Sequence, residues 1–202
     1  MISAIVLAAG QSRRMGCQKL LLPFGGQTVI AHVVGAVLRS AIAETCVVVG
    51  GGRDRIAEAL AGSGVTYVTN PDPAGDMLSS VRCGLRALSP RTEAILVVLG
   101  DQPGITSTLI DEMIRAFTDA KDGIIVPVHA GQRGHPLLLS AVYRDEILTG
   151  HEDVGLRGLL HAHPDDILDL SVATPAVLSD IDTPQDYRRA LARVSIRAKR
   201  KP

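Results

Sequence analysis

Short apolar runs alternate with amphipathic stretches along nearly the whole chain, and this alternation limits the folds that the sequence can adopt. Strands are predicted at residues 2–7, 44–49, 65–69, 95–99, 123–128 and 167–170. Helices are predicted at residues 28–40, 53–60, 78–88, 106–120, 142–148, 154–161 and 184–194. Such alternation is typical of a mostly parallel sheet with helices on both faces, so we predict an α/β fold. The strongly apolar run Ile95–Leu99 is expected at the sheet centre.

The chain has no internal repeat and no linker long enough to separate two domains. Its 202 residues suffice for one domain with a sizeable core, which we expect to span residues 1–195. Residues 196–202 are basic and lack an apolar face, so this tail is expected to be disordered.

Composition excludes several classes of partner. Lys and Arg together equal Asp and Glu at 21 each, so no net charge draws the chain to nucleic acid or to a membrane surface. Aromatic residues are too few for a base-stacking platform. The apolar runs are too short to span a bilayer, and we expect no signal peptide. Three cysteines without metal-ligand spacing favour a reduced, cytoplasmic setting.

The loop after the first predicted strand has the composition of a phosphate-binding segment. The sequence from Leu7 to Lys19 reads L-A-A-G-Q-S-R-R-M-G-C-Q-K. Its glycines allow a close backbone approach to a ligand, and Arg14 and Lys19 can pair with different phosphate oxygens. The spacing fits neither a Walker A loop nor a G-x-G-x-x-G dinucleotide turn. Cys17 lacks a paired base and is interpreted as a bystander.

Two aspartates follow apolar segments at the same predicted edge of the sheet. Asp101 comes directly after the central run, and Asp182 precedes the last helix. Ligands of open α/β sheets bind beyond the carboxyl ends of the strands, so both carboxylates could hold a Mg²⁺ that bridges nucleotide phosphates. Each has a simpler interpretation, because Asp101 could cap a turn and Asp182 could be the N-cap of the last helix.

Several motifs together resemble the cytidylyltransferase branch of the molybdenum-cofactor nucleotidyltransferases over nearly the whole length. The first loop matches the pattern L-A-A-G-x-S-x-R-M-G-x-x-K at every fixed position. Residues 99–103 match L-G-D-Q-P, residues 133–136 match R-G-H-P, and residues 180–184 match D-I-D-T-P. The resemblance implies a Rossmann-like three-layer α/β/α nucleotidyltransferase fold with a mostly parallel sheet.

The resemblance also implies an activity and its residues. The expected reaction is Mg²⁺-dependent transfer of CMP from CTP to molybdopterin carrying molybdenum, with release of pyrophosphate. The implied catalytic residues are Arg14, Lys19 and Asp101, and the implied metal ligands are Asp101 and Asp182. The residues expected to bind the nucleotide are Leu7, Ala8, Ala9, Gly10, Arg14, Lys19 and Asp101. The guanylyl branch has glycine where this chain has Ala9, so Ala9 favours CTP. A molybdoenzyme of the xanthine oxidase family is the implied protein partner.

The acceptor half of the site departs from the family pattern. The residues expected to bind the acceptor are Asn70, Ser80, His135, Asp153 and Arg157. Pro73 stands where the family has an aromatic residue, and Asp76 and Glu152 each replace a glycine. His135 could equally be a surface or packing histidine. Three alternatives therefore stay open: GTP as the donor to molybdopterin, a sugar or polyol phosphate as the acceptor, and a non-catalytic module that binds or delivers the cofactor.

Overall fold

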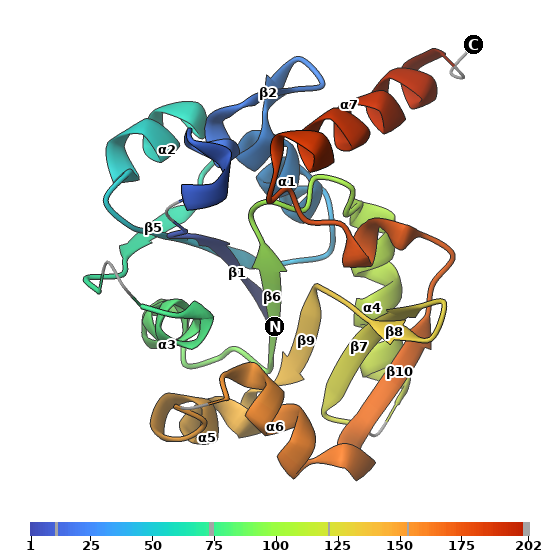
Figure 1. Cartoon of the computed structure of the whole chain (residues 1–202). Helices are drawn as coiled ribbons and strands as arrows, with labels where there is room; N and C mark the ends of the chain where they lie inside the picture. The colour runs from blue at the N-terminus through green and yellow to red at the C-terminus, as the bar shows by residue number, and fades with distance from the viewer. Residues whose placement is uncertain (11, 73–74, 121, 153, 200–202) are drawn as a thin grey trace.

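An eight-stranded sheet runs through the middle of the computed structural model (Figure 1). The structure describes residues 1–10, 12–72, 75–120, 122–152 and 154–199, with the backbone only for residues 13 and 194–199. The strand order is β10-β7-β9-β6-β1-β4-β5, and β8 pairs with β7. The sheet strands are β1 (Ile2–Ala8), β4 (Glu44–Val49), β5 (Thr66–Thr69), β6 (Ala94–Leu99), β7 (Ile124–His129), β8 (Gln132–Arg133), β9 (Leu137–Ser140) and β10 (Ile167–Ser171). A separate hairpin is formed by β2 (Pro23–Phe24) and β3 (Gln27–Thr28).

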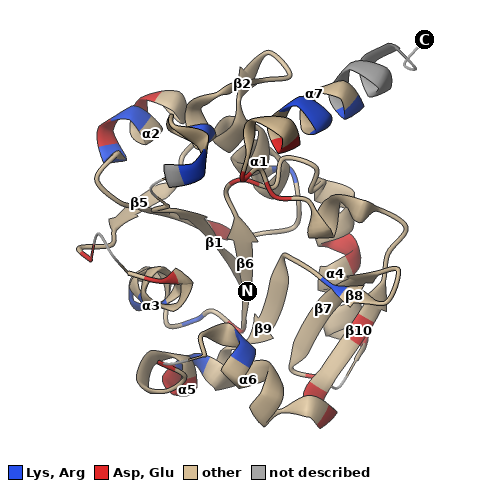
Figure 2. Cartoon of the chain, in the orientation of Figure 1, with Lys and Arg blue, Asp and Glu red and all other residues tan. Residues whose placement is uncertain are grey.

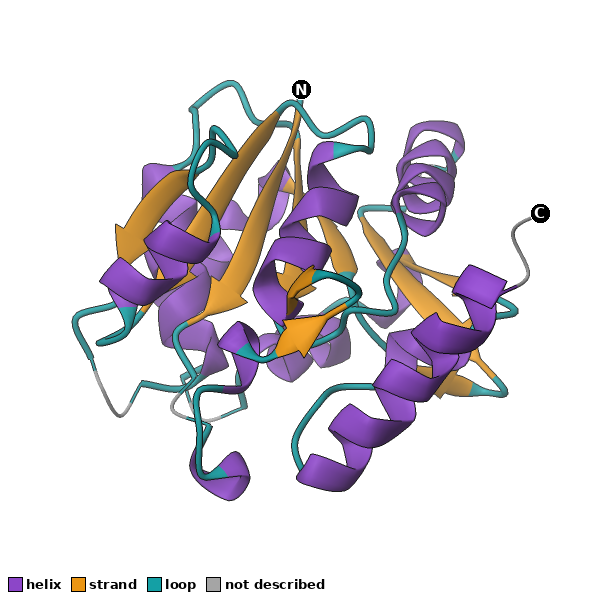
Figure 3. Cartoon of the chain, turned by 90° about the horizontal axis from the view of Figure 1, so that it is seen from above, coloured by secondary structure: helices purple, strands orange, loops and turns teal. Residues whose placement is uncertain are grey.

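Helices cover both faces of the sheet, so the fold has three layers (Figure 3). The helices are α1 (Val29–Leu38), α2 (Arg53–Ala59), α3 (Met77–Ala87), α4 (Ser107–Asp119), α5 (Arg144–Thr149), α6 (Leu156–Ala162) and α7 (Pro184–Lys199). Short 3₁₀ turns lie at Arg13–Met15, Lys19–Leu21, Ala141–Tyr143, Pro164–Asp166 and Pro175–Leu178. No helix in the described ranges is both long and apolar enough to span a membrane.

The two faces of the sheet bury separate cores, because alternate strand residues point to opposite sides. In β1, Ala4 and Val6 face the core formed with α1, α2 and α4, whereas Ile5 faces the core formed with α3, α5 and α6. Both faces are therefore apolar, as a central parallel strand requires.

The predicted class is confirmed: the fold is α/β, with a mostly parallel sheet between helical layers. The strand β6 lies at the middle of the strand order, as its composition predicts. Three features differ from the sequence predictions or were not anticipated by them. The strand β9 runs antiparallel to both β6 and β7, the hairpin of β2 and β3 is additional, and α7 continues to Lys199 instead of ending near Val194. Residues 200–202 of the predicted tail lie outside the described residues.

Close packing of α3 on β1 depends on one glycine. A Cβ atom built on Gly84 would lie 2.6 Å from Cγ2 of Ile5, which is fully buried. Gly84→Ala is therefore expected to destabilise the fold by about 1–3 kcal/mol through overpacking, measured by urea unfolding.

Gly35→Ala is a matched control, since Gly35 also lies inside a helix but the nearest atom to its added Cβ is the flexible end of Arg39, at 3.0 Å. There the gain in helix propensity should leave stability unchanged or raise it by up to about 1 kcal/mol. Equal effects of the two substitutions would contradict this account of the contact.

Candidate active site

Three segments that are distant in sequence meet beyond the carboxyl ends of the central strands. The backbone N–H of Gly100, after β6, donates to the carbonyl of Leu7 in β1 at 3.0 Å. The N–H of Ile181, before α7, donates to the carbonyl of Asp101 at 3.0 Å. These two bonds bring the first loop, the turn after β6 and the segment before α7 to one edge of the sheet.

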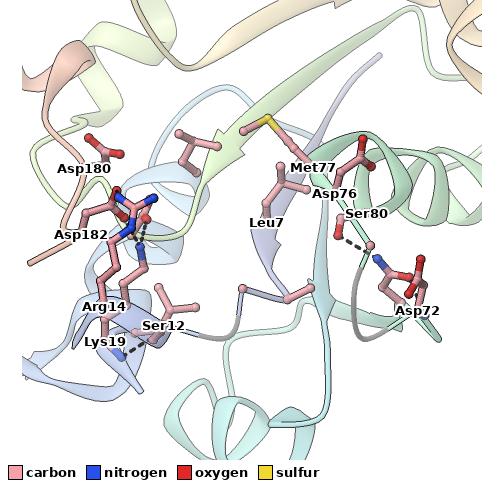
Figure 4. Close-up of a pocket in the computed structure, with 17 residues that line it drawn as sticks. Leu7, Ser12, Arg14, Lys19, Asp72, Asp76, Met77, Ser80, Asp180 and Asp182 are labelled. Carbon is pink, nitrogen blue, oxygen red and sulfur yellow. Dashed lines mark hydrogen bonds and ion pairs between the residues drawn. The ribbon is translucent and has the colours of Figure 1, made fainter. Parts of the chain in front are cut away.

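A cavity of about 590 Å³ opens at this edge (Figure 4). Figure 4 shows Arg14, Lys19, Asp180 and Asp182 on one side of it, and Asp72, Asp76, Met77 and Ser80 on the other. The lining residues are Leu7, Ala9, Gly10, Ser12, Arg14, Lys19, Leu20, Asn70, Asp72, Gly75, Asp76, Met77, Ser80, Leu99, Asp101, Asp180 and Asp182.

The first loop turns sharply and delivers its basic residues to the cavity. Ser12 and Gly16 have positive φ angles of 50° and 68° and flank the 3₁₀ turn Arg13–Met15. The Oγ atom of Ser12 accepts a hydrogen bond from the backbone N–H of Lys19 at 3.3 Å, which ties the two ends of the loop together. The glycine at position 16 suits this left-handed conformation, which side chains with a Cβ rarely adopt.

Lys19 joins the predicted metal ligands through one ammonium group. Its Nζ atom lies 2.5 Å from Oδ2 of Asp101 and 2.9 Å from Oδ1 of Asp182. Nη1 of Arg14 contacts the other oxygen of Asp182, Oδ2, at 2.9 Å. The side chains of Lys19 and Asp101 are 13% and 17% exposed, whereas that of Arg14 is 77% exposed. The structure thus brings together all four residues that the sequence predicts for catalysis and metal binding.

Burial and charge act in opposite directions on this cluster. Burial lowers the pKa of Lys19, but the carboxylates of Asp101 and Asp182 more than offset it, so the pKa is raised and the ammonium stays protonated. Burial raises the pKa of Asp101, and the charge of Asp180 adds to this, so the attraction of Lys19 only partly compensates. A further positive charge in the site would therefore stabilise the ionised form of Asp101.

The donor set fits a divalent cation bound together with a nucleotide. In the described part of the chain, no group of three or more His, Cys, Asp or Glu side chains is arranged to hold a metal by itself. Asp101 and Asp182 nevertheless direct carboxylate oxygens to a common positive charge, that of Lys19. Mg²⁺ is commonly bound by one or two carboxylates plus substrate phosphates, and this pair supplies that number of ligands.

The simpler interpretation of Asp182 as the N-cap of α7 is wrong. The cap is Thr183, whose Oγ1 accepts from the backbone N–H of Asp186 at 3.3 Å. Asp186 in turn accepts from the backbone N–H of Thr183 at 2.9 Å, which completes a capping box. Asp182 stands one residue before the cap, and its carboxylate is available to the cavity.

Asn70 and Ser80 also line the cavity, but their polar atoms bond to each other. Both are 5% exposed, and Nδ2 of Asn70 donates to Oγ of Ser80 at 3.0 Å and to Oγ of Ser79 at 2.8 Å. Oδ1 of Asn70 accepts from the backbone N–H of Asp72 at 3.0 Å. These contacts hold the turn between β5 and α3, so both residues shape the wall of the cavity.

The other predicted residues lie around the cavity or away from it. Ala8, the last residue of β1, is buried in the core that the sheet forms with α1, α2 and α4, and it does not line the cavity. His135 and Arg157 do not line the cavity either, but the charge of Arg157 and that of Asp180, which does line it, both act on the pKa of His135. Burial lowers that pKa, Asp180 opposes the shift and Arg157 adds to it, so the imidazole tends toward its neutral form. Asp153 and Pro73 lie outside the described residues.

Several lining residues were not predicted from the sequence, and Asp180 is the most consequential. Its charge acts on the pKa values of both Asp101 and His135. The sequence does contain a signal for Asp180, which is the pair of aspartates on either side of Ile181. Both aspartates of that pair line the cavity. The others with polar side chains are Ser12, Asp72 and Asp76. Asp76 caps α3 by accepting from the backbone N–H of Ser79 at 2.8 Å, and α3 therefore opens at the cavity wall.

A mostly parallel sheet with a basic loop and paired carboxylates beyond its central strands is typical of enzymes that act on nucleotides. Comparison with known proteins is consistent with this class. Residues 4–167 match the MobA-like NTP transferase domain. The molybdenum cofactor cytidylyltransferase of Escherichia coli K12 is 30% identical, with 95% of this chain and 96% of that protein aligned. The nicotine blue oxidoreductase of Paenarthrobacter nicotinovorans is 28% identical, with 94% and 96% aligned.

The solved structure of Rv0371c from Mycobacterium tuberculosis H37Rv is similar as well. It superposes with a TM-score of 0.85 at 30% identity, covering 95% of this chain and 97% of that one. A complex of the same protein with manganese superposes with a TM-score of 0.79. The chain belongs to the MobA-like NTP transferase family and is a nucleotidyltransferase.

The capping box at Thr183 predicts a local and pH-dependent effect on stability. Thr183→Ala removes the cap of α7 and should cost about 1 kcal/mol at neutral pH, whereas Thr183→Ser should retain most of it. Hydrogen bonds with Thr183 lower the pKa of Asp186, so the stabilisation is present above the carboxyl group's unfolded pKa and is lost as the pH falls through its folded pKa.

Denaturant unfolding at neutral pH and near pH 3 checks this. The difference between Thr183→Ala and the wild type should shrink at the acidic pH. A difference that stays constant would show that the carboxylate of Asp186 has no part in the cap.

Proposed function

We propose that this chain transfers CMP from CTP to a molybdopterin-type cofactor and releases pyrophosphate. The observation that carries the proposal is the shared contact of Lys19 with Asp101 and Asp182 beside the first loop. A cofactor-delivery module has no need of such a site, since the site suits a metal-bound triphosphate. The full-length similarity to a molybdenum cofactor cytidylyltransferase supports the choice of donor and acceptor.

In this proposal an oxygen of the acceptor's terminal phosphate attacks the α-phosphorus of CTP. The bond from the α-phosphorus to the bridging oxygen of pyrophosphate breaks, and pyrophosphate leaves with the bonding electrons. The first loop and Lys19 hold the triphosphate, and Arg14 meets the negative charge that develops on pyrophosphate. Asp101 and Asp182 would hold a Mg²⁺ ion, which would neutralise phosphate charge.

Lys19 can serve both states of the enzyme. Without nucleotide its ammonium balances the two carboxylates. With a metal-bound triphosphate in the site, Asp101 and Asp182 would hold the divalent cation and Lys19 would be able to pair with phosphate oxygens.

A pyrophosphate-release assay tests the proposal directly. The purified chain is supplied with molybdenum cofactor, or with a sugar or polyol phosphate in its place, and with CTP, GTP or ATP in turn, with Mg²⁺ present or chelated. Pyrophosphate release is expected only with metal present and is expected to be fastest with CTP, which gives a cytosine dinucleotide product. Release that requires a sugar or polyol phosphate in place of the cofactor would overturn the acceptor, and no release with any pair would overturn the transferase mechanism. Because one relative is named as an oxidoreductase, the product itself must be identified by mass.

Substitution of either proposed metal ligand is expected to remove turnover while the protein stays folded. Asp101→Asn and Asp182→Asn should each lower kcat by about two to three orders of magnitude or more, because charge stabilisation in the transition state is lost. Asp165→Asn, at an exposed position in the turn before β10, is the control and should keep full activity. Near-normal activity of one ligand variant at saturating Mg²⁺ would remove that residue from the metal site.

Ala9 is proposed to select CTP over GTP. It lines the cavity, and its backbone is held close to Gly50, where an added Cβ would lie 3.0 Å from the carbonyl oxygen of Ala9. The contact with Gly50 limits how far the backbone of Ala9 can shift away from a bound nucleotide. The methyl group of Ala9 therefore reduces the space for a purine base. We expect a preference for CTP of about 1–3 kcal/mol in kcat/KM, which Ala9→Gly should reduce.

The measurement compares kcat/KM for CTP and GTP in the wild type and in Ala9→Gly. A wild type that prefers GTP would overturn the cytidylyl assignment. A CTP preference that Ala9→Gly leaves unchanged would keep the assignment and reject the steric explanation.

A further inference from the structure

A histidine-carboxylate cluster joins α5 to α6 outside the cavity. Oε1 of Glu146, in α5, lies 2.8 Å from Nε2 of His151, and Oε2 lies 2.8 Å from Nε2 of His163. The two histidines flank α6, one in the turn before it and the other directly after it. One carboxylate therefore holds both ends of this seven-residue helix.

His151 is held in a conformation that a free turn would not favour. Its φ angle is 68°, in the left-handed region that costs a residue with a side chain about 1 kcal/mol or more. Its carbonyl accepts from the backbone N–H groups of Val154 and Gly155, at 3.3 and 2.8 Å, so the turn closes on this residue. Such strain persists only where surrounding contacts impose it.

The imidazole of His151 also packs directly on the backbone of α6. A Cβ atom built on Gly158 would lie 2.5 Å from Nδ1 of His151. A side chain at position 158 would therefore collide with the imidazole, and the side chain of His151 is only 15% exposed. The contact fixes the distance between the turn and the first residues of α6.

Arg82 connects the same turn to the cavity wall. From α3 it donates to the carbonyls of Ile147 at 2.8 Å and Gly150 at 2.6 Å, and it approaches Glu152 at 3.6 Å. Because α3 opens at the cavity, with Met77 and Ser80 in its lining, α3 links the turn to the site.

Other charged groups near Glu146 complete the cluster. The ring of Tyr143 packs against that of His163 with centroids 4.7 Å apart, and its hydroxyl donates to Asp166. Burial would raise the pKa of Glu146, but its hydrogen bonds with His163 and His151 more than offset this and lower it. The carboxylate is thus charged at neutral pH, and a neutral imidazole can still donate to it, so the contacts do not depend on histidine protonation.

The cluster that holds α6 also determines the position of Arg157, which belongs to that helix. It lies in the first turn of α6, next to the glycine that receives His151, and its charge acts on His135 together with that of Asp180. Asp180 belongs to the cavity lining. We infer that Glu146, His151 and His163 are positioning residues that hold α6 so that Arg157 stands at the acceptor side of the cavity. The inference rests on the proposed function for the identity of the acceptor.

A kinetic double-mutant cycle tests it. His151→Ala is expected to raise KM for molybdenum cofactor about tenfold while KM for CTP stays unchanged, because only the acceptor side loses its alignment. Arg157→Ala should give a similar rise, and the double variant should add little to either, since both act through one group. His151→Gln, which keeps a donor toward Glu146, should recover part of the loss. Additive effects, or equal increases for both substrates, would overturn the positioning role.

Gly158 supplies an independent arm of the test. Gly158→Ala alone should displace the imidazole and mimic His151→Ala, whereas in the His151→Ala background the same change should be tolerated. If Gly158→Ala is equally harmful in both backgrounds, the ring contact is not what positions the helix.

Hydrogen exchange separates failure of the inference from failure of the proposed function. In His151→Ala, amides of residues 154–162 should exchange faster, while those of α1 and α4 should not change. If the wild type transfers nothing to molybdenum cofactor, the proposed function fails, and unchanged exchange in α6 would overturn the clamp in any case. Faster exchange in α6 with no rise in the acceptor KM would leave the cluster purely structural and overturn its role in positioning Arg157.

Discussion

The ammonium group of Lys19 holds together a site assembled from three parts of the chain. Its two carboxylate partners lie 82 and 163 residues further along the sequence. Each group is costly to bury alone, and removal of one partner leaves the others with an uncompensated charge. The contact is possible only because backbone bonds from Gly100 to Leu7 and from Ile181 to Asp101 hold the three segments in register. The ion pairs of the site therefore depend directly on the geometry of the sheet.

The sequence was informative wherever a local pattern decides the structure. The strand at Glu44–Val49 has the predicted bounds, and α1 and α4 begin after Thr28 and Thr106, each of which caps its helix with a side-chain hydroxyl. The joining of Asp101 to Asp182 followed from a rule about the edge of parallel sheets. These features depend on hydrophobic periodicity, on capping chemistry and on topology, and all three can be recognised in residue order.

Other features depend on contacts that no local pattern encodes. The apolar run Leu137–Ser140 does not specify its direction, because side chains alternate in the same way in parallel and antiparallel strands. Asp182 and Thr183 are both good capping residues, and only the bonds between Thr183 and Asp186 decide between them. Asn70 was expected to bind the acceptor, yet its side chain is bonded to serines of α3, and its proposed role toward the acceptor stays a prediction. The charges of the chain are spread over its helices with both signs (Figure 2), so net charge offered no further guide to the site.

The reversed strand β9 has a consequence for how this fold can change its substrates. After β7 the chain turns into the short strand β8, which pairs with β7, and then continues into β9, whose first residue, Leu137, pairs with Val97 near the end of β6. Residues 130–136 therefore form a hairpin connection at the carboxyl edge, with His135 in it, and need no helix to cross over the sheet. A crossover helix must bury a face against the core, whereas this connection is fixed between its ends by backbone bonds from Gly134 to Pro127 and from His135 to Val177. The connection between β7 and β9 can therefore change outside the cavity lining while the first loop after β1 and the turn after β6 stay the same.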